Sequence, residues 1–338
     1  MSSDVINPIS EGQAERRDRA FLVSLRRKLM RQESSLLFVI LIIGVYVETK
    51  NSIFLSRGNI TNIANESVIY LVPACGSALL MIGGGLDFSV GSTFTLGGIT
   101  SAWMLVHGVA WPLAVLAGIG VGMIVGVVNH AIITYLHVPP IIATLGTFYV
   151  ISGLTVQFTG GNDILPLPEG FQNLGQGSVG GVPYIVIYAI IIALAAWFLL
   201  QMTRFGVNVR ALGGNRQAAI ANRIPAKTLD LRLYMLSAAT AAFAGIIYAA
   251  SVGSGQVEAG GAGTTLTIIT AVLIGGVSLL GGLGTVTGVV IGTILLTEIN
   301  NGLVIANVPP QYNNIVIGTI LVCAVAVDHL RRQRLYRK

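Results

Sequence analysis

The chain has 338 residues, of which 53% are hydrophobic and only 10% are charged. Ordinary soluble domains have about 25% charged residues, so this composition excludes a typical soluble enzyme or binding module and indicates a membrane protein. The net charge of +6 fits a basic membrane surface and gives no reason to invoke a nucleic-acid partner.

Apolar runs recur along most of the chain, and many have the roughly 17 to 25 residues that a helix needs to cross a bilayer. The alternating pattern of a transmembrane barrel is absent, so we predict an all-α polytopic membrane protein. About ten transmembrane helices are expected, with glycine-broken segments among them. Their ranges are 35–53, 64–82, 90–106, 111–135, 140–158, 183–202, 231–252, 266–280, 285–304 and 312–328.

The basic residues predict the orientation of these helices. Seven of the 20 Lys and Arg precede residue 35, six lie within 204–232, and five follow residue 330. The positive-inside rule places all three groups in the cytoplasm. We therefore expect a cytoplasmic tail over 1–34, a transmembrane domain over 35–328 with a cytoplasmic loop at 204–232, and a second cytoplasmic tail over 329–338.

The stretch GGGLDFSVGS, residues 83–92, interrupts an apolar run with three glycines and a lone carboxylate. The glycines disfavour a continuing helix, whereas Asp87, Ser89 and Ser92 are residue types that cap a new one. A carboxylate within a spanning helix costs about 2.5 to 3.5 kcal/mol on insertion scales. We expect Asp87 to cap the restarted helix, with a direct role in the permeation path as the alternative.

A second run, LIGGVSLLGGLG at 273–284, is also broken by glycines, and paired interruptions point to the central site of a transporter. Glycines four residues apart predict helix faces that pack closely within the chain or, alternatively, against a second copy. These are Gly118, Gly122 and Gly126 in one run and Gly284, Gly288 and Gly292 in another.

Glu298 is the other intramembrane acid, and Asn300 and Asn301 follow it closely. No basic residue lies nearby in the sequence, so hydrogen bonding or protonation must accommodate the carboxyl group. The alternative is an interfacial acid near the extracytoplasmic end of its helix.

Motifs for catalysis, nucleotide binding and metal binding are absent from the sequence. The four histidines lack metal-ligand spacing, no Gly-Lys pair exists to form a Walker A loop, and no GxSxG elbow is present. We therefore expect no enzyme activity, no metal and no other cofactor in this chain. Cys75 and Cys323 are interpreted as packing residues inside helices.

The polar segment 204–232 is expected to carry a short helix. Gly213 and Gly214 form a turn, and Asn215 is a good N-cap for RQAAIANR. Pro225 is expected to end this helix, because the residue before a proline avoids helical dihedrals. A helix of about two turns is marginal in water and needs a surface to pack on. Such a helix suits a permease that receives a push from a partner protein.

Four segments form a specific combination: GGGLDFSVGS at 83–92, ATLGT at 143–147 after VPP, ALGGNRQAA at 211–219, and the glycine-rich run at 275–303 that ends in Asn-Asn-Gly. Together they resemble the permease subunits of bacterial ABC importers of the ribose and sugar type. The resemblance extends from about residue 54 to the C-terminal helix. It implies import of a ribose-like monosaccharide or related polyol across the inner membrane.

The resemblance also implies partners: a cytoplasmic ABC ATPase, a periplasmic sugar-binding protein, and a second permease copy or paralogue. The implied coupling residues are Gly213, Gly214, Asn215, Arg216, Ala218 and Ala219. The implied transport core consists of Asp87, Ser89, Gly91, Ser92, Thr144, Glu298, Asn300 and Asn301. Lys50 and Arg57, the only basic residues expected outside, are candidates for docking the binding protein, or are merely solvated.

The alternatives to an ABC permease are a secondary carrier or channel and a membrane-embedded enzyme. A self-contained secondary carrier or channel for a small polar solute would need buried ionisable pairs, and the chain offers only the isolated Asp87 and Glu298. A membrane-embedded enzyme would need catalytic motifs.

Three positions depart from the family pattern: Arg223 stands where the family has glycine before Ile224, a threonine replaces the usual acid in AGTTLTIITAVLIGG, and His137 stands near the usual basic residue.

Overall fold

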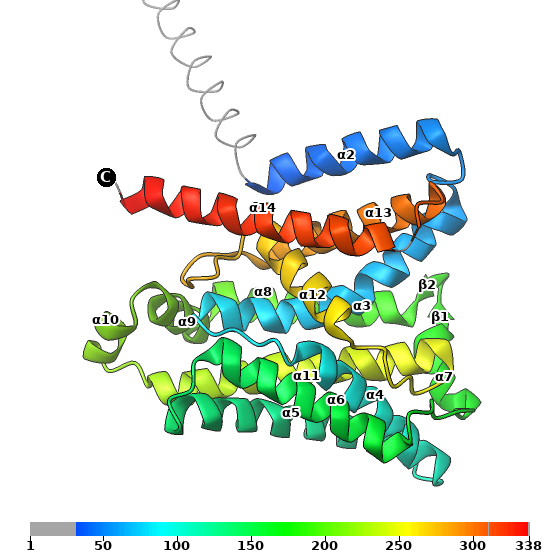
Figure 1. The fold of residues 1–338 in the computed structure, drawn as a ribbon, viewed down its shortest axis with the longest axis horizontal. Helices are drawn as coiled ribbons and strands as arrows, with labels where there is room; N and C mark the ends of the chain where they lie inside the picture. The colour runs from blue at the N-terminus through cyan, green and yellow to red at the C-terminus, as the bar shows by residue number, and fades with distance from the viewer. Residues whose placement is uncertain (1–31, 310, 337–338) are drawn as a thin grey trace, which may run out of the picture.

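The computed structural model describes residues 32–309 and 311–336, and helices dominate it (Figure 1). The predicted all-α class is thereby confirmed. Most of the predicted tail 1–34 and the last two residues of the predicted tail 329–338 lie outside the described residues.

Helices follow one another closely along the described chain. They are α2 (Gln32–Lys50), α3 (Arg57–Ile82), α4 (Val90–Val106), α5 (Trp111–Tyr135), α6 (Pro140–Thr159), α7 (Glu169–Gln176), α8 (Tyr184–Met202), α9 (Arg204–Gly214), α10 (Arg216–Ala221), α11 (Ala226–Val252), α12 (Ala262–Ile274), α13 (Val286–Ile305) and α14 (Gln311–Tyr336). The strands β1 (Ser178–Val179) and β2 (Val182–Pro183) pair as a small antiparallel hairpin.

The predicted C-terminal end of the helix over 266–280 is wrong. Helix α12 stops at Ile274, where Gly275 is the C-cap and Gly276 has a φ of 85°. A positive φ of this kind costs an L-residue free energy but costs glycine little, so the glycine pair ends the helix.

Seven of the described helices are long and apolar enough to cross a membrane: α3, α5, α6, α8, α11, α13 and α14. Helices α4 and α12 are apolar but have only 17 and 13 residues. At about 1.5 Å per residue they reach roughly 25 and 20 Å, less than a hydrocarbon core of about 30 Å. Helix length alone therefore does not establish the predicted count of about ten.

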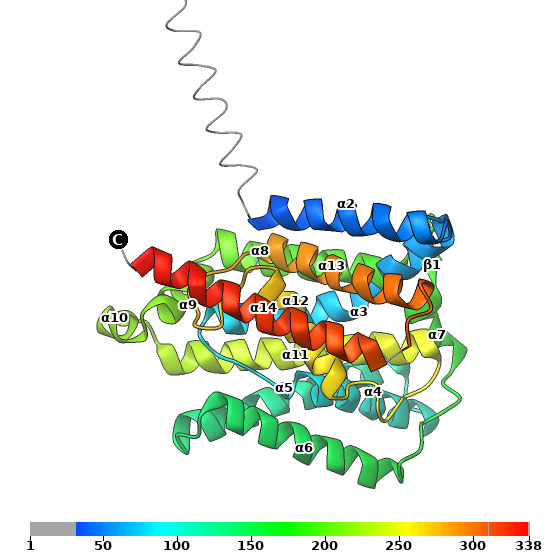
Figure 2. The same cartoon turned by 45° about the horizontal axis from the view of Figure 1, so that its top comes forward.

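The molecule has two distinct ends along the long axis of its helices (Figure 1). Helices α9 and α10 and the C-terminal part of α14 lie at one end, which we call the α10 end. Helix α7 and the β1–β2 hairpin lie at the other, which we call the α7 end. In both views α2 and α6 lie on opposite sides of the bundle (Figures 1 and 2).

The four helices α3–α6 and the four helices α11–α14 follow the same plan. Each set begins with a helix of 26 or 27 residues, continues with a short helix, and ends with two longer ones. The short helix of each set packs on the first helix of the other: α4 contacts α11, and α12 contacts α3. Each glycine-broken segment also contacts the first helix of the other set: Gly83 faces Leu233 of α11, and Gly284 faces Ile82 of α3.

The glycine-bearing faces pack within the chain, as predicted. A Cβ atom on Gly122 of α5 would meet Ala242 of α11, and one on Gly292 of α13 would meet Ala271 of α12. Small residues let helix backbones approach closely where the lipid supplies no hydrophobic drive for association. Gly284 does not belong to its expected helix face, because it precedes α13 and has a φ of 152°.

Candidate functional site

The chain folds back on itself between α3 and α4. Helix α3 ends with Gly83 as its C-cap, Gly84 has a φ of 88°, and α4 begins at Val90. The segment between them is not helical, and it carries Asp87 and Ser89, which are 3% and 0% exposed. A buried carboxylate in this position needs polar partners.

Ser89 and Asn129 supply those partners. The Oδ1 atom of Asp87 accepts hydrogen bonds from the backbone N–H of Ser89 at 2.8 Å and from its hydroxyl at 2.6 Å. The amide of Asn129 on α5 donates to the Ser89 hydroxyl at 2.8 Å and to Asp87 Oδ1 at 3.4 Å. No described residue is a partner of the buried Oδ2 atom. We call these three residues the Asp87 cluster.

The predicted capping role of Asp87 is wrong. The N-cap of α4 is Ser89, and its side chain makes no capping hydrogen bond. Asp87 stands two residues before that position, so its carboxylate reaches the Ser89 N–H in an Asx turn instead of the first free amides of the helix. Its role in the structure is to hold Ser89 and the turn.

Thr144 and Gly91 adjoin the Asp87 cluster. The backbone N–H of Phe88 donates to the Thr144 hydroxyl at 3.0 Å. A Cβ atom on Gly91 would meet the backbone of Gly260 and the side chain of Thr265, so the start of α4 packs tightly on the segment before α12. The Ser92 hydroxyl donates to the Ser89 carbonyl at 3.0 Å. The structure thus brings five of the predicted core residues together: Asp87, Ser89, Gly91, Ser92 and Thr144.

The other three predicted core residues lie elsewhere, on α13. The Asn301 and Asn59 amides exchange two hydrogen bonds, at 2.8 and 3.0 Å, which tie α13 to the start of α3. Glu298 is buried beside Gly44 of α2, and Asn300 is also buried. Asn301 thus holds α13 to α3, whereas the Glu298 Oε2 and Asn300 Oδ1 atoms are buried and have no hydrogen-bond partner among the described residues. The structure does not bring these three residues to the Asp87 cluster.

The predicted cap of the short helix is confirmed. Asn215 Oδ1 accepts a hydrogen bond from the Ala218 N–H at 3.0 Å and caps α10. Ala219 is buried beneath the helix, whereas Gly214 and Ala218 are exposed.

An ion pair ties α10 to α11. Arg216 contacts Asp230 with an N–O distance of 2.5 Å, and the Asp230 carboxylate raises the pKa of Arg216 above its usual value. The guanidinium therefore stays charged at every working pH. Because about half of the Arg216 side chain is exposed, at 52%, the pair contributes only about 0.2 to 1 kcal/mol.

Pro225 does not end this helix, contrary to the prediction. The N–H groups of Arg223 and Ile224 donate to the carbonyls of Ile220 and Ala219 at 2.9 and 3.1 Å. This is the Schellman pattern, in which the residue at C′ adopts a left-handed conformation. Arg223 is that residue, with a φ of 60°. The family that this chain resembles has a glycine at this position, and glycine adopts the left-handed conformation readily. That departure is the sequence feature that indicates where the helix ends.

The prediction that Gly213 and Gly214 form a turn is wrong, because both are helical and end α9. At the α10 end this glycine-containing helix end meets the segments that follow α3 and α12. A Cβ atom on Gly213 would clash with the Ile82 carbonyl, and the Gly282 N–H donates to that same carbonyl at 2.8 Å. Gly281 lies against both Gly213 and Gly84. We call this contact the glycine junction. It connects the segment that carries α10 to both glycine-broken segments, a connection that the separate sequence motifs do not reveal.

Lys50 and Arg57 lie close together in the chain at the α7 end. Both are exposed, and the Lys50 ammonium lies 5.9 Å from the centre of the Tyr46 ring. They are therefore accessible to a partner.

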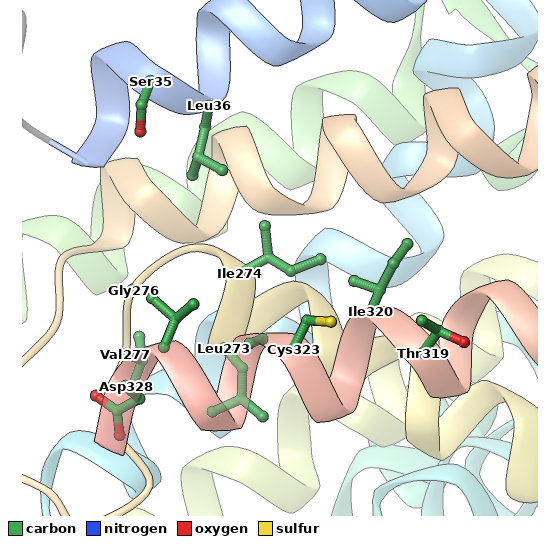
Figure 3. A pocket seen from close by; sticks show the side chains of 12 residues that line it. Ser35, Leu36, Leu273, Ile274, Gly276, Val277, Thr319, Ile320, Cys323 and Asp328 are labelled. Atoms are coloured by element: carbon green, nitrogen blue, oxygen red, sulfur yellow. The ribbon is translucent and has the colours of Figure 1, made fainter. Parts of the chain in front are cut away.

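A hollow of about 610 Å³ lies between α2, the end of α12 and α14 (Figure 3). Its lining is largely apolar and includes Leu273, Ile320 and Cys323. Asp328 stands at its edge and accepts a hydrogen bond from Ser278 at 2.8 Å. This hollow does not adjoin the Asp87 cluster.

Comparison with known proteins identifies the family. Residues 59–325 match the family model described as the permease component of the branched-chain amino acid transport system. The galactose/methyl galactoside import permease protein MglC of Haemophilus influenzae is 36% identical over 319 residues, which cover 89% of this chain and 95% of that protein. The D-allose transport system permease protein AlsC of Escherichia coli is 33% identical over 291 residues, covering 86% and 89%.

A third relative, the autoinducer 2 import system permease protein LsrC of Salmonella typhi, is 31% identical over 315 residues, covering 90% of each chain. No solved structure gives a significant match. The family match covers most of the chain and includes the Asp87 cluster, α10 and the glycine junction. The chain therefore belongs to this family of multi-pass inner-membrane permease components, and it is a transport subunit, not an enzyme.

Proposed function

We propose that this chain is the permease subunit of an ABC importer that carries a sugar, a ribose-like monosaccharide or related polyol, across the inner membrane. The names of its relatives support the class, since they are import permeases for galactose, allose and autoinducer 2. The observation on which the proposal rests is made at the α10 end. There a capped, exposed helix is connected to both glycine-broken segments through the glycine junction.

The ATPase partner docks on α10. Gly214, Asn215, Arg216 and Ala218 are exposed there, whereas Ala219 is buried and anchors the helix to the bundle. When the ATPase displaces α10, the displacement moves Gly213, whose backbone contacts the end of α3 and the segment after α12. Backbone atoms in close contact move together, whereas flexible side chains would change rotamer instead.

The chain crosses the membrane ten times, with both termini in the cytoplasm. Seven crossings are the long apolar helices, and α2 is an eighth. The other two combine α4 and α12 with the non-helical segments that precede them. Such segments are tolerated at membrane depth where they are buried in protein. The α10 end is then cytoplasmic, because the six basic residues of 204–232 lie there.

Lys50 and Arg57 help to dock the sugar-binding protein at the α7 end. A reversal of both charges, Lys50→Glu with Arg57→Glu, is expected to slow uptake most strongly at low salt, because exposed charges steer association and are screened by ions. Unchanged uptake across a range of low salt concentrations would exclude this role.

A second permease, either a copy or a paralogue, completes the pathway. The Asp87 cluster and Thr144 form the core of this chain's half, while Glu298, Asn300 and Asn301 belong to a separate part of the transport pathway on α13.

Reconstitution tests the proposed function. The permease is placed in proteoliposomes with its ATPase and sugar-binding protein, and uptake of D-galactose, D-allose and D-ribose is measured. Uptake is expected only with ATP and all components present. Uptake by the permease alone would favour the secondary carrier or channel instead.

A further inference from the structure

The α7 end contains a hollow of about 640 Å³ whose lining differs from the apolar hollow of Figure 3. It lies between the end of α6, the end of α11 and the segment before α12. Its polar side chains are Asn162, Asp163, Tyr248, Gln256 and Glu258.

The walls of this hollow are held by hydrogen bonds between two chain segments. Ile164 and Gly255 exchange a pair of backbone hydrogen bonds, both at 2.9 Å. The Asp163 carboxylate accepts a hydrogen bond from the Val257 N–H at 2.9 Å. These contacts fix the segment that carries Gln256 and Glu258, so the polar groups are preorganised and their ordering costs little on binding.

The polar groups form a set suited to hydroxyl groups. Tyr248 donates to the Gln256 side-chain oxygen at 2.9 Å, which orients that amide, and the Tyr248 ring packs against Phe94 at 5.6 Å between centroids. Glu258 is exposed and offers a carboxylate. Carboxylates and amide oxygens accept hydrogen bonds, and the hydroxyls of a polyol donate them.

The charge of the lining excludes anionic ligands. No Lys or Arg is among the described residues that line the hollow, whereas Asp163 and Glu258 are both acidic. A phosphate or carboxylate would meet repulsion here, since like charges in a partly desolvated site cost free energy. A neutral polyhydroxyl compound meets no such penalty.

The hollow adjoins the predicted transport core. Its segment 256–259 leads directly to Gly260, whose N–H donates to Thr95 of α4 at 2.8 Å and whose backbone packs on Gly91. The buried hydroxyl of Thr265 lies against Gly91, and no described residue is a hydrogen-bond partner of its oxygen. Polar groups therefore continue from the hollow toward the Asp87 cluster.

We propose that this hollow is the outer substrate site of the permease, where a neutral monosaccharide or polyol binds to Gln256, Glu258 and Tyr248 before it enters the transport pathway. Asp163 is a positioning residue that holds Val257. The inference rests on the proposed import of a sugar, and it adds a site to that proposal.

The first test measures protection of a cysteine in the hollow. Gln256→Cys is made in the full complex after replacement of Cys75 and Cys323 by alanine, and its labelling by a membrane-impermeant maleimide is timed with D-galactose, D-allose or D-ribose. One sugar is expected to slow labelling about tenfold, which corresponds to roughly 1.4 kcal/mol. The control Ser178→Cys, exposed on β1 at the same end, is expected to react equally fast with and without sugar.

The second test separates sugar handling from partner docking. Glu258→Gln is expected to lower maximal uptake about tenfold while the loaded binding protein still stimulates ATP hydrolysis, and the exposed Glu169→Gln is the control. Equal loss of uptake and stimulation would assign Glu258 to docking and overturn the proposal. Unchanged uptake in Glu258→Gln, together with no protection of the Gln256→Cys thiol by any sugar, would also overturn it. If the wild-type complex imports none of the sugars, the proposed function fails instead.

Discussion

At Asp87, one oxygen makes all the hydrogen bonds that the structure describes for the side chain, and this determines the effect of substitution. Asp87→Asn keeps an acceptor for Ser89 and Asn129, so we expect normal assembly and substantial uptake. Asp87→Ala leaves buried donors without an acceptor, which costs about 1 to 3 kcal/mol. Thermal inactivation of the purified complex and sugar uptake are the measurements.

The amide variant is also the control for the charge. If Asp87→Asn abolishes uptake in a complex of normal stability and subunit composition, the negative charge itself is required. The alternative interpretation, a direct role of Asp87 in the permeation path, then replaces the structural one.

Arg223 has a left-handed conformation that glycine adopts at lower cost. Arg223→Gly is expected to stabilise the end of α10 by about 1 kcal/mol, because a left-handed L-residue costs roughly that much. Hydrogen exchange of the residue 223 and Ile224 amides should slow about fivefold. Arg210→Gly, inside α9, is the matched control and should speed exchange in that helix. Faster exchange in Arg223→Gly would contradict the argument.

Local chemistry explains which residues the sequence predicts correctly. Asn215 is recognisable as a cap because it acts on an amide only three residues away. The long-range partner of Asp87 is not recognisable, since Asn129 lies 42 positions further along the chain. The predicted end of α10 is misplaced because a proline gives a stronger local signal than an arginine with a positive φ.

Helix α10 offers a test at the level of a single element. Among the described residues, no atom beyond the neighbouring backbone lies within 4 Å of a Cβ atom built on Gly214, and Ala218 is exposed. Gly214→Leu and Ala218→Leu are therefore expected to leave folding unchanged while they block the docking of the ATPase. Uptake should fall at least about tenfold, and ATP hydrolysis should no longer respond to the binding protein.

Gly213→Leu is the contrasting variant at the neighbouring position. Its side chain would overlap the Ile82 carbonyl, so it is expected to lower the stability of the complex as well as its uptake. Equal stability losses in Gly213→Leu and Gly214→Leu would contradict the distinction between the packed and the exposed glycine.

Helix bounds are predictable within a few residues for most elements because hydrophobicity and glycine act locally. The glycine junction is not predictable in this way, since Gly84, Gly281 and the α9 residue Gly213 lie far apart in the chain. The sequence identifies each of these glycines separately as part of a break or a loop. Only the packing of α3, α9 and α12 shows that one contact joins them.

At the scale of the whole molecule, the two sets α3–α6 and α11–α14 cross-pack through their short helices. This arrangement is not evident from the sequence, because the two sets share similar helix lengths but no repeated residue pattern. Their glycine breaks also differ in place, since one precedes α4 and the other follows α12. The arrangement places the two interruptions against each other's long helices, as in transporters built from internal repeats. Movement of one interruption is therefore expected to affect the other.

The charge distribution predicts which end of the molecule faces the cytoplasm. The α10 end carries the six basic residues of 204–232, whereas the α7 end carries Lys50 and Arg57. Single cysteines introduced at Gln217 of α10 and Ser178 of β1, both exposed, report on these two ends after replacement of Cys75 and Cys323. In intact cells a membrane-impermeant maleimide should label position 178 and leave position 217 unlabelled until the inner membrane is opened. Labelling of position 217 from outside, with position 178 protected, would invert the topology and exclude ATPase docking on α10.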